Sequence, residues 1–175
     1  KMAYPMIHAT IDAVGRFRAL LEGSGGMAAS LAALSGSYGR EGATLADLKV
    51  EFLRVPAEIH EKSVSPKHPV VHVYCDRIEN RRTEKFRPFS GRMRLVTEVR
   101  ISQDRLEGIT ETLHFYLDGL RDVVEKSAGC AGDGMYLDGE YEVTIEAVRK
   151  GGLNYQQVAK ISCWVILNRS FLNRS

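Results

Sequence analysis

Cysteine is scarce in this sequence, and its three cysteines, Cys75, Cys130 and Cys163, are far apart. An odd number at wide spacings indicates neither a disulfide framework nor a metal site built from paired cysteines. Cys75 and Cys163 lie in apolar, strand-like runs, so we expect buried free thiols in a reducing compartment. A chain of 175 residues can bury a core of ordinary size without such cross-links.

Long apolar runs are missing as well. The longest uninterrupted stretches, such as 163–167, fall far short of the ~20 residues that span a bilayer, and no secretory signal pattern opens the chain. We therefore expect a soluble intracellular protein that contacts no membrane. Because position 1 is a lysine, we also expect residues upstream of it.

Motifs of catalysis and of cofactor binding are absent from the sequence. It contains no P-loop and no G-x-S-x-G, and the glycine-rich stretch 23–26 follows a helix pattern, where glycine usually ends the helix. His68 and His72 flank Pro69 in an extended stretch, about 13 Å apart at ~3.3 Å per residue, which is too far to share a zinc ion. We expect no enzyme, cofactor or metal site, with a site assembled from scattered residues as the alternative.

Helices are predicted where apolar residues recur every three or four positions. Asp104, with Glu107 three residues later, predicts a capping box at the start of a long helix that ends at the glycines of 129–134. Residues 27–34 predict a short helix. The long helix has the apolar stripe Leu106, Ile109, Leu113, Leu117, Leu120 and Val124, and a helix after Pro5 has the stripe Ile7, Ile11, Val14, Phe17 and Leu21.

Strands are predicted where apolar and polar residues alternate or β-branched residues cluster. In the segment 70–75 β-branched residues cluster. The segments 92–101 and 140–147 follow a period of two, which indicates a core face and a solvated face. In 155–167 the apolar residues share one face, and Gly151 and Gly152 before it suit a hairpin turn. Segment 48–55 is compatible with a strand or with a short helix capped by Asp47.

The order of these elements predicts the fold class. Strands occur in adjacent pairs and do not alternate with helices, so we expect an α+β fold: an antiparallel β-sheet with two main helices packed on one face. We expect a single domain over 1–175 with an irregular insertion at 24–66. In that insertion, 35–43 predicts a loop, and 56–69, with three prolines, predicts a surface excursion.

Positive charge is concentrated between residues 77 and 100. This stretch holds eight basic residues but only three glutamates, and Phe86 and Phe89 lie among them. Nucleic-acid binding would use such a patch, but the net charge of the whole chain is only +2, which makes direct contact with nucleic acid the less favoured interpretation. The basic residues are Arg77, Arg81, Arg82, Lys85, Arg87, Arg92, Arg94 and Arg100.

Two other interpretations of this charge stay open. The arginines could lie on a solvated face and pair with Glu140, Glu142 and Glu146 on a neighbouring strand. Alternatively, 77–91 could be a connector that becomes ordered on contact with another subunit or protein.

The arrangement from Ile7 to Leu167 resembles the tail terminator proteins of long-tailed bacteriophages. The features that support this resemblance are the N-terminal amphipathic helix, the strand Pro69-Val70-Val71-His72-Val73, the strand 91–101, the long helix after Asp104 and the closing hairpin 140–167. The likeness is an order of elements that covers most of the chain, with no residue signature.

This resemblance implies a virion protein without catalytic residues. Such proteins form a ring, usually of six copies, on the last ring of the tail tube, where they end tube growth and face the head connector. We therefore expect a homo-oligomer located at the head–tail junction after assembly in the bacterial cytoplasm, with the tail tube protein and the head–tail connector protein as partners. Another head–tail connector or neck protein, and a small-molecule-binding or enzymatic α+β domain, remain as alternatives.

The residues that we expect at its protein interfaces are charged. The basic members come from the connector and the strand after it, and the acidic members from the strand 140–147. They are Arg77, Arg81, Arg82, Lys85, Arg87, Arg92, Arg94, Glu142 and Glu146.

Overall fold

The structure is a computed structural model, and it describes residues 9–39, 51–53, 69–80, 89–131 and 134–169. Within these residues seven strands form one sheet in the order β1-β2-β3-β7-β5-β4, and β6 is also paired with β7. Neighbouring strands are antiparallel except for the parallel pair β1–β2. The strands are β1 Glu51–Leu53, β2 Val70–Asn80, β3 Phe89–Gln103, β4 Gly129–Cys130, β5 Met135–Ile145, β6 Arg149–Gly151 and β7 Asn154–Arg169.

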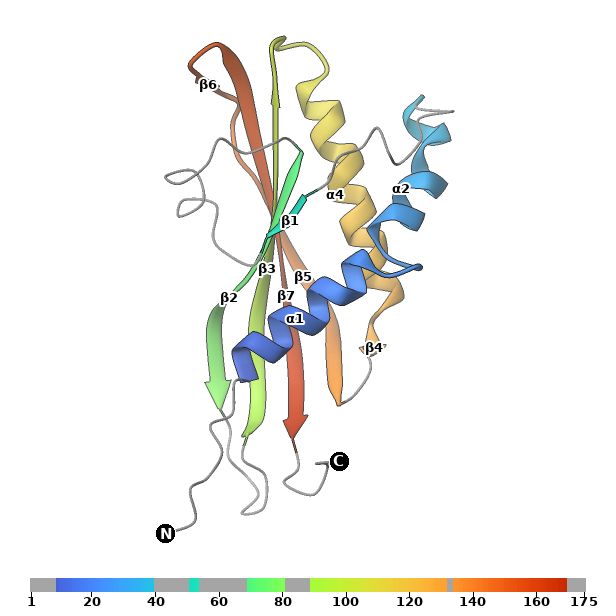
Figure 1. Cartoon of the computed structure of the whole chain (residues 1–175), viewed down its shortest axis with the longest axis vertical. Helices are drawn as coiled ribbons and strands as arrows, with labels where there is room; N and C mark the ends of the chain where they lie inside the picture. Colours follow the sequence, from blue (N-terminus) through green and yellow to red (C-terminus); the bar gives the residue numbers. More distant parts are fainter. Residues whose placement is uncertain (1–8, 40–50, 54–68, 81–88, 132–133, 170–175) are drawn as a thin grey trace.

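Helices lie on one face of this sheet, which confirms the predicted α+β class (Figure 1). The helix α1 (Ala9–Glu22) crosses β2, β3 and β7, and α4 (Ile109–Lys126) lies along β3 and β7. The short helix α2 (Met27–Leu34) packs mainly on α4 and is followed by the 3-10 helix η1 (Gly36–Tyr38). The helix α2 confirms the short helix predicted at 27–34, which lies within the predicted insertion 24–66.

The core lies between the sheet and the helices. The alternating side chains of β3 that were predicted to face inward are all buried, and so are their cross-strand neighbours on β7. Ile109, Leu113, Leu117, Leu120 and Val124 of α4 are buried in the same cluster, as predicted. The inward-facing residues of the two strands are Met93, Leu95, Thr97, Val99 and Ile101 of β3, and Ala159, Ile161, Cys163, Val165 and Leu167 of β7.

A second buried face of α4 was not predicted from the sequence. Phe115, Tyr116, Gly119 and Val123 are buried as well, because α2 packs on this side of the helix. A Cβ atom at position 119 would come within 2.6 Å of Cδ2 of Leu31, so the absence of a side chain lets the two helices approach each other closely.

The starts of the two main helices differ from the prediction. Ile11 is 62% exposed, because α1 buries Ala9, Ala13, Val14, Phe17 and Leu21 and Ile11 falls outside this arc. The helix α4 begins at Ile109 after Gly108, which has a positive φ of 75° and makes no side-chain cap. The capping box at Asp104 is therefore wrong, and Leu106 lies 55% exposed in the turn before the helix. Ile7 is outside the described residues.

The connector predicted at 77–91 is shorter than expected, because β2 continues to Asn80 and β3 begins at Phe89. A β-bulge between Cys75 and Arg77 shifts the register by one residue, so that Ile78 and not Arg77 is paired with Met93. This break in alternation concealed the second half of β2. Both ends of the connector are thus ordered by strand pairing within this chain, and 81–88 lies outside the described residues.

The structure also tests the sequence-based expectations for segment 48–55, for His72 and for the cysteines. Residues 51–53 form a strand, which resolves the ambiguity of 48–55, and His72 lies in extended chain as predicted. Cys163 is buried but Cys75 is only half-buried, which corrects the expectation that both thiols are fully buried. Residues 54–68, which include His68 and most of the predicted excursion, lie outside the described part.

We expect Leu113→Ala to lower the free energy of unfolding by about 2–5 kcal/mol, because Leu113 is fully buried between α4 and the sheet. Urea unfolding of the two proteins measures the difference. Leu153→Ala is the matched control, since Leu153 is 93% exposed and should change stability by less than about 0.5 kcal/mol. Equal small losses in both variants would contradict the placement of Leu113 in the core.

Candidate functional site

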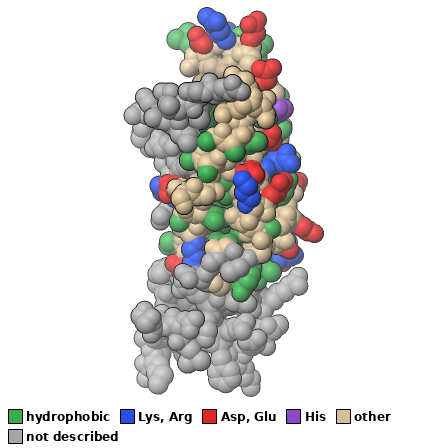
Figure 2. Space-filling model, turned by 90° about the vertical axis from the view of Figure 1, so that its right-hand side faces the viewer, with side chains coloured by type: hydrophobic (Ala, Val, Ile, Leu, Met, Phe, Trp, Pro, Cys, Tyr) green, Lys and Arg blue, Asp and Glu red, His purple; other side chains and the backbone are tan. Residues whose placement is uncertain are grey.

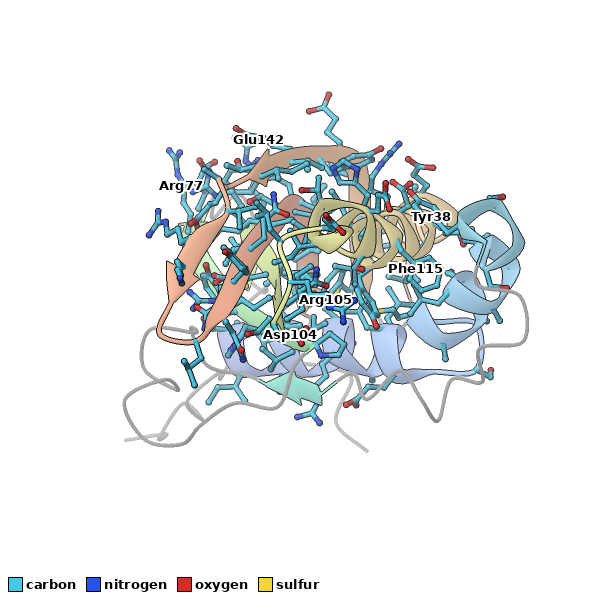
Figure 3. All side chains as sticks on the ribbon, turned by 90° about the horizontal axis from the view of Figure 1, so that it is seen from above. Tyr38, Arg77, Asp104, Arg105, Phe115 and Glu142 are labelled. Atoms are coloured by element: carbon cyan, nitrogen blue, oxygen red, sulfur yellow. The ribbon has the colours of Figure 1, made fainter. Side chains whose placement is uncertain are left out.

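The helix-free face of the sheet, which we call the open face, holds five of the predicted interface residues. They come from three strands and the residue after one of them: Arg77 on β2, Arg92 and Arg94 on β3, Glu142 on β5 and Glu146 just after β5. Figure 3 shows Arg77 and Glu142 on the side of the molecule away from Tyr38 and Phe115. Arg81, Arg82, Lys85 and Arg87 lie outside the described residues.

The arginines of β3 bind carboxylates of β2. Nε of Arg92 donates to Glu79 at 2.7 Å, and Arg94 holds Asp76 through two hydrogen bonds of 2.9 and 2.6 Å. Each hydrogen bond to a carboxylate raises the pKa of its guanidinium. The predicted pairing with a neighbouring strand that carries Glu140, Glu142 and Glu146 is wrong, because the neighbours of β3 are β2 and β7 and β5 lies beyond β7.

A second charge cluster surrounds Glu98, whose side chain is only 4% exposed. Arg100 approaches it to 2.6 Å and Lys160 of β7 to 3.7 Å, and Lys160 also reaches Glu146 at 3.4 Å. A buried carboxylate needs such partners, because burial removes its hydration. The sequence pattern singled out neither Lys160 nor Asp76, since only the strand order brings them beside their partners.

Aromatic and apolar side chains complete the open face. The guanidinium of Arg92 lies over the ring of Trp164 at 4.3 Å, in the range of a cation–π contact. Beside it, the cross-strand pair Tyr136 and Ile166 is 43% and 39% exposed. A shallow pocket of about 210 Å³ is lined by Arg94, Glu140, Tyr141, Glu142, Ser162 and Trp164.

On the helix side, a larger cleft of about 500 Å³ runs between α4 and β5. Its polar groups bind one another: Arg121 donates to the hydroxyl of Tyr141 at 3.1 Å and to Asp118 at 3.1 Å, and Tyr141 in turn donates to Glu125. In Figure 2 the described residues of the face that carries α2 and α4 show charged and apolar side chains interspersed. The cleft is lined by His114, Leu117, Asp118, Arg121, Tyr141, Val143 and Ile145.

The carboxylate of Asp118 also anchors η1. Tyr38 donates its hydroxyl proton to Asp118, and its ring packs edge-on against Phe115 with ring centroids 5.4 Å apart. Burial and then this hydrogen bond raise the pKa of Tyr38 to about 12. The contact ties the segment after α2 to α4.

Two further kinds of group can be assessed in the described part of the chain: cysteine thiols and clusters of metal-ligating side chains. Burial raises the pKa of the Cys163 thiol to about 12, which disfavours the reactive thiolate. Among the described residues no group of three or more His, Cys, Asp and Glu side chains could hold a metal ion. No helix there is long and apolar enough to cross a membrane.

Both edges of the sheet are partly unpaired within the described residues. At one edge, β1 pairs with Val70, Val71 and His72, and no other described strand lies outside β2. At the other edge, β4 pairs only with Tyr136 and Leu137 of β5, which leaves the outer edge of Tyr141–Ile145 unpaired. Unpaired strand edges present backbone donors and acceptors to another chain.

Compared with known proteins, the sequence matches no family model and no curated protein. The geometry of this chain therefore supplies the arguments about its function.

We expect the free energy of unfolding to fall between pH 10 and about 12, in part because of Tyr38. The unfolded tyrosine loses its proton near its ordinary pKa of 10.0, whereas the folded one keeps it up to about 12, so rising pH favours the unfolded state in this window. Tyr38→Phe should show a shallower loss in alkaline denaturation. Tyr136→Phe, at an exposed tyrosine, is the control, and an unchanged slope in Tyr38→Phe would contradict the assignment.

Proposed function

We propose that this protein is a structural subunit of a ring of identical copies that ends the tail tube of a long-tailed bacteriophage. The order of elements on which the resemblance to tail terminators rests has its counterpart in α1, β2, β3, α4 and the pair β5–β7. In this proposal the copy number is six, and the partners are the tail tube protein and the head–tail connector protein.

The observation that supports the ring most directly is that described strands cover both edges of the sheet only in part. A ring requires heterologous contacts, in which one surface of a subunit meets a different surface of the next. The edges at β2 and β5 lie on opposite sides of one sheet, and one helix-covered face is common to both. Such a subunit offers two different surfaces in an arrangement that suits a ring.

A small-molecule-binding domain is the second candidate, and the cleft between α4 and β5 favours it. At about 500 Å³ the cleft is large enough for a small ligand. His114 and Arg121 supply polar groups, and Leu117 and Val143 supply apolar wall. Against this candidate, Arg121 already binds Asp118 and Tyr141.

The mass of the purified protein tests the ring. Light scattering over a concentration series should give a species of six times the 19.5 kDa of one chain, and electron micrographs should show closed rings. A monomer at every concentration would contradict the proposal, and a ring of another copy number would correct the count of six.

The role at the end of the tail requires a test in the phage. Labelled protein should be found at the head–tail junction of virions, and a phage that lacks it should make tails of abnormal length. Normal tails without the protein would reject the terminator role. A location at the neck without an effect on tail length would favour another head–tail connector protein.

A further inference from the structure

The outer side of β5 beyond its register shift presents backbone groups that no described strand uses. The N–H of Glu146 donates to the carbonyl oxygen of Val158 at 2.9 Å, so these two residues form a hydrogen-bonded pair between β5 and β7. Such pairs alternate along an antiparallel strand with residues whose backbone groups point outward. Every second residue of 141–145 therefore points its N–H and C=O away from β7. These residues are Tyr141, Val143 and Ile145.

The side chains of the same three residues lie on the helix side of the sheet, where they line the cleft against α4. Val143 is half-buried and Ile145 is 44% exposed. A strand added at this edge would lie about 4.8 Å from β5, and its residues opposite Val143 and Ile145 would also turn their side chains toward the cleft. Apolar side chains at these positions would remove both residues from water, which is favourable.

The other side of this edge is acidic. Asp138, Glu140 and Glu142 occupy alternate positions of β5, are exposed, and make no ion pair within the described residues. Glu140 and Glu142 line the shallow pocket of about 210 Å³ on the open face, together with the ring of Trp164. Arg94, which also lines this pocket, is already bound to a carboxylate of β2. Two carboxylates beside an aromatic ring are the groups that bind a lysine or arginine side chain.

We propose that this edge of β5 binds an extended segment of a partner protein in which apolar residues alternate with lysine or arginine. The segment adds a strand to the sheet. Its apolar side chains enter the cleft beside Ile145, and its basic side chains reach Glu140 and Glu142 on the open face. Main-chain hydrogen bonds provide the affinity of such strand addition, and the alternate side chains provide its specificity.

Charge favours a basic partner over the same edge of a second copy. The open-face side of 140–146 carries Glu140, Glu142 and Glu146 with Thr144 and no basic residue. Two copies of this edge would bring like charges together, which is unfavourable across neighbouring strands.

The inference does not rest on the ring of the proposed function, because one copy of the chain and one segment of the partner suffice. The edge is short, and a neighbouring copy in a ring can contact the rest of this side, where β4 pairs with Tyr136 and Leu137. The partner and the ring can therefore be tested separately.

Synthetic peptides test the interface. The probe is a fluorescent peptide of alternating lysine and valine, as long as a typical strand, and the control peptide has glutamate in place of lysine. The fluorescence anisotropy of the probe should rise and saturate as protein is added. The control peptide should bind about tenfold more weakly, because it places carboxylates beside Glu140 and Glu142.

Methylation of backbone nitrogens in the probe separates strand addition from attraction by charge alone. Methyl groups on the valine nitrogens remove the donors that face β5 in an antiparallel arrangement, and methyl groups on the lysine nitrogens remove those that face it in a parallel one. One of the two methylated peptides should lose binding by about tenfold or more, and its identity gives the direction of the added strand. Equal effects of the two methylations would reject strand addition.

Variants of the protein locate the contact. Glu142→Arg should weaken binding of the lysine–valine probe by about three- to tenfold and strengthen binding of the glutamate–valine peptide, because it reverses the charge beside the added strand. Ile145→Lys should abolish binding of the probe, since an inward-pointing lysine prevents strand addition. Glu107→Arg, in the exposed turn before α4, makes the same change of charge away from the edge and should leave the binding of both peptides unchanged.

The other outcomes reject the proposal in different ways. No saturable binding of the probe rejects the partner, and equal binding of the glutamate–valine peptide rejects its basic chemistry. Self-association that Ile145→Lys abolishes, without binding of the probe, makes a second copy the occupant of the edge. The mass of the protein decides the ring independently: a monomer that binds the probe retains this interface without the ring, and a ring that does not bind it retains the ring without this interface.

Discussion

The pairing of β3 with β7 is the interaction on which the rest of the structure depends. It runs through all 15 residues of β3 without a register shift, from the pair Phe89–Arg169 to the pair Gln103–Tyr155. Because side chains alternate along a strand, this register fixes which residues of both strands lie in the core. The helix α4 packs on these two strands, and β2 and β5 are added on either side.

Within the described residues the helices cover one face only, so the other face is stabilised without a helical layer. Ion pairs between strands contribute there: Arg92 with Glu79, Arg94 with Asp76, and Lys160 with Glu98. Glu98 also pairs with Arg100 on its own strand. The partly exposed pairs contribute little stability each, but they define the register of β2 against β3. The same arrangement occupies the guanidiniums of Arg92 and Arg94, whereas Arg77 keeps an exposed side chain that a partner can reach.

Assembly through strand edges would be consistent with the partial covering of the sheet by the described helices and strands. The described strands cover the two edges of this sheet only in part, and register shifts in β2 and β5 shorten its regular edges. Short edges with charged residues resist unspecific aggregation. Backbone groups at such edges can still bind another chain, which is the feature on which the proposed ring relies.

Periodicity in the sequence by itself determined the α+β class, the stripe of α4 from Ile109 to Val124 and the inward faces of β3 and β7, because local alternation reflects which side of an element is buried. Local pattern did not reveal the end of β2, where a bulge breaks the alternation, or the start of α4, where a turn at Gly108 replaces the predicted cap. It identified the charged residues of the open face but assigned Arg92 and Arg94 to the wrong partners. Only the strand order, which depends on contacts between residues distant in sequence, placed them beside Glu79 and Asp76 and put β2 and β5 near opposite edges of the described sheet.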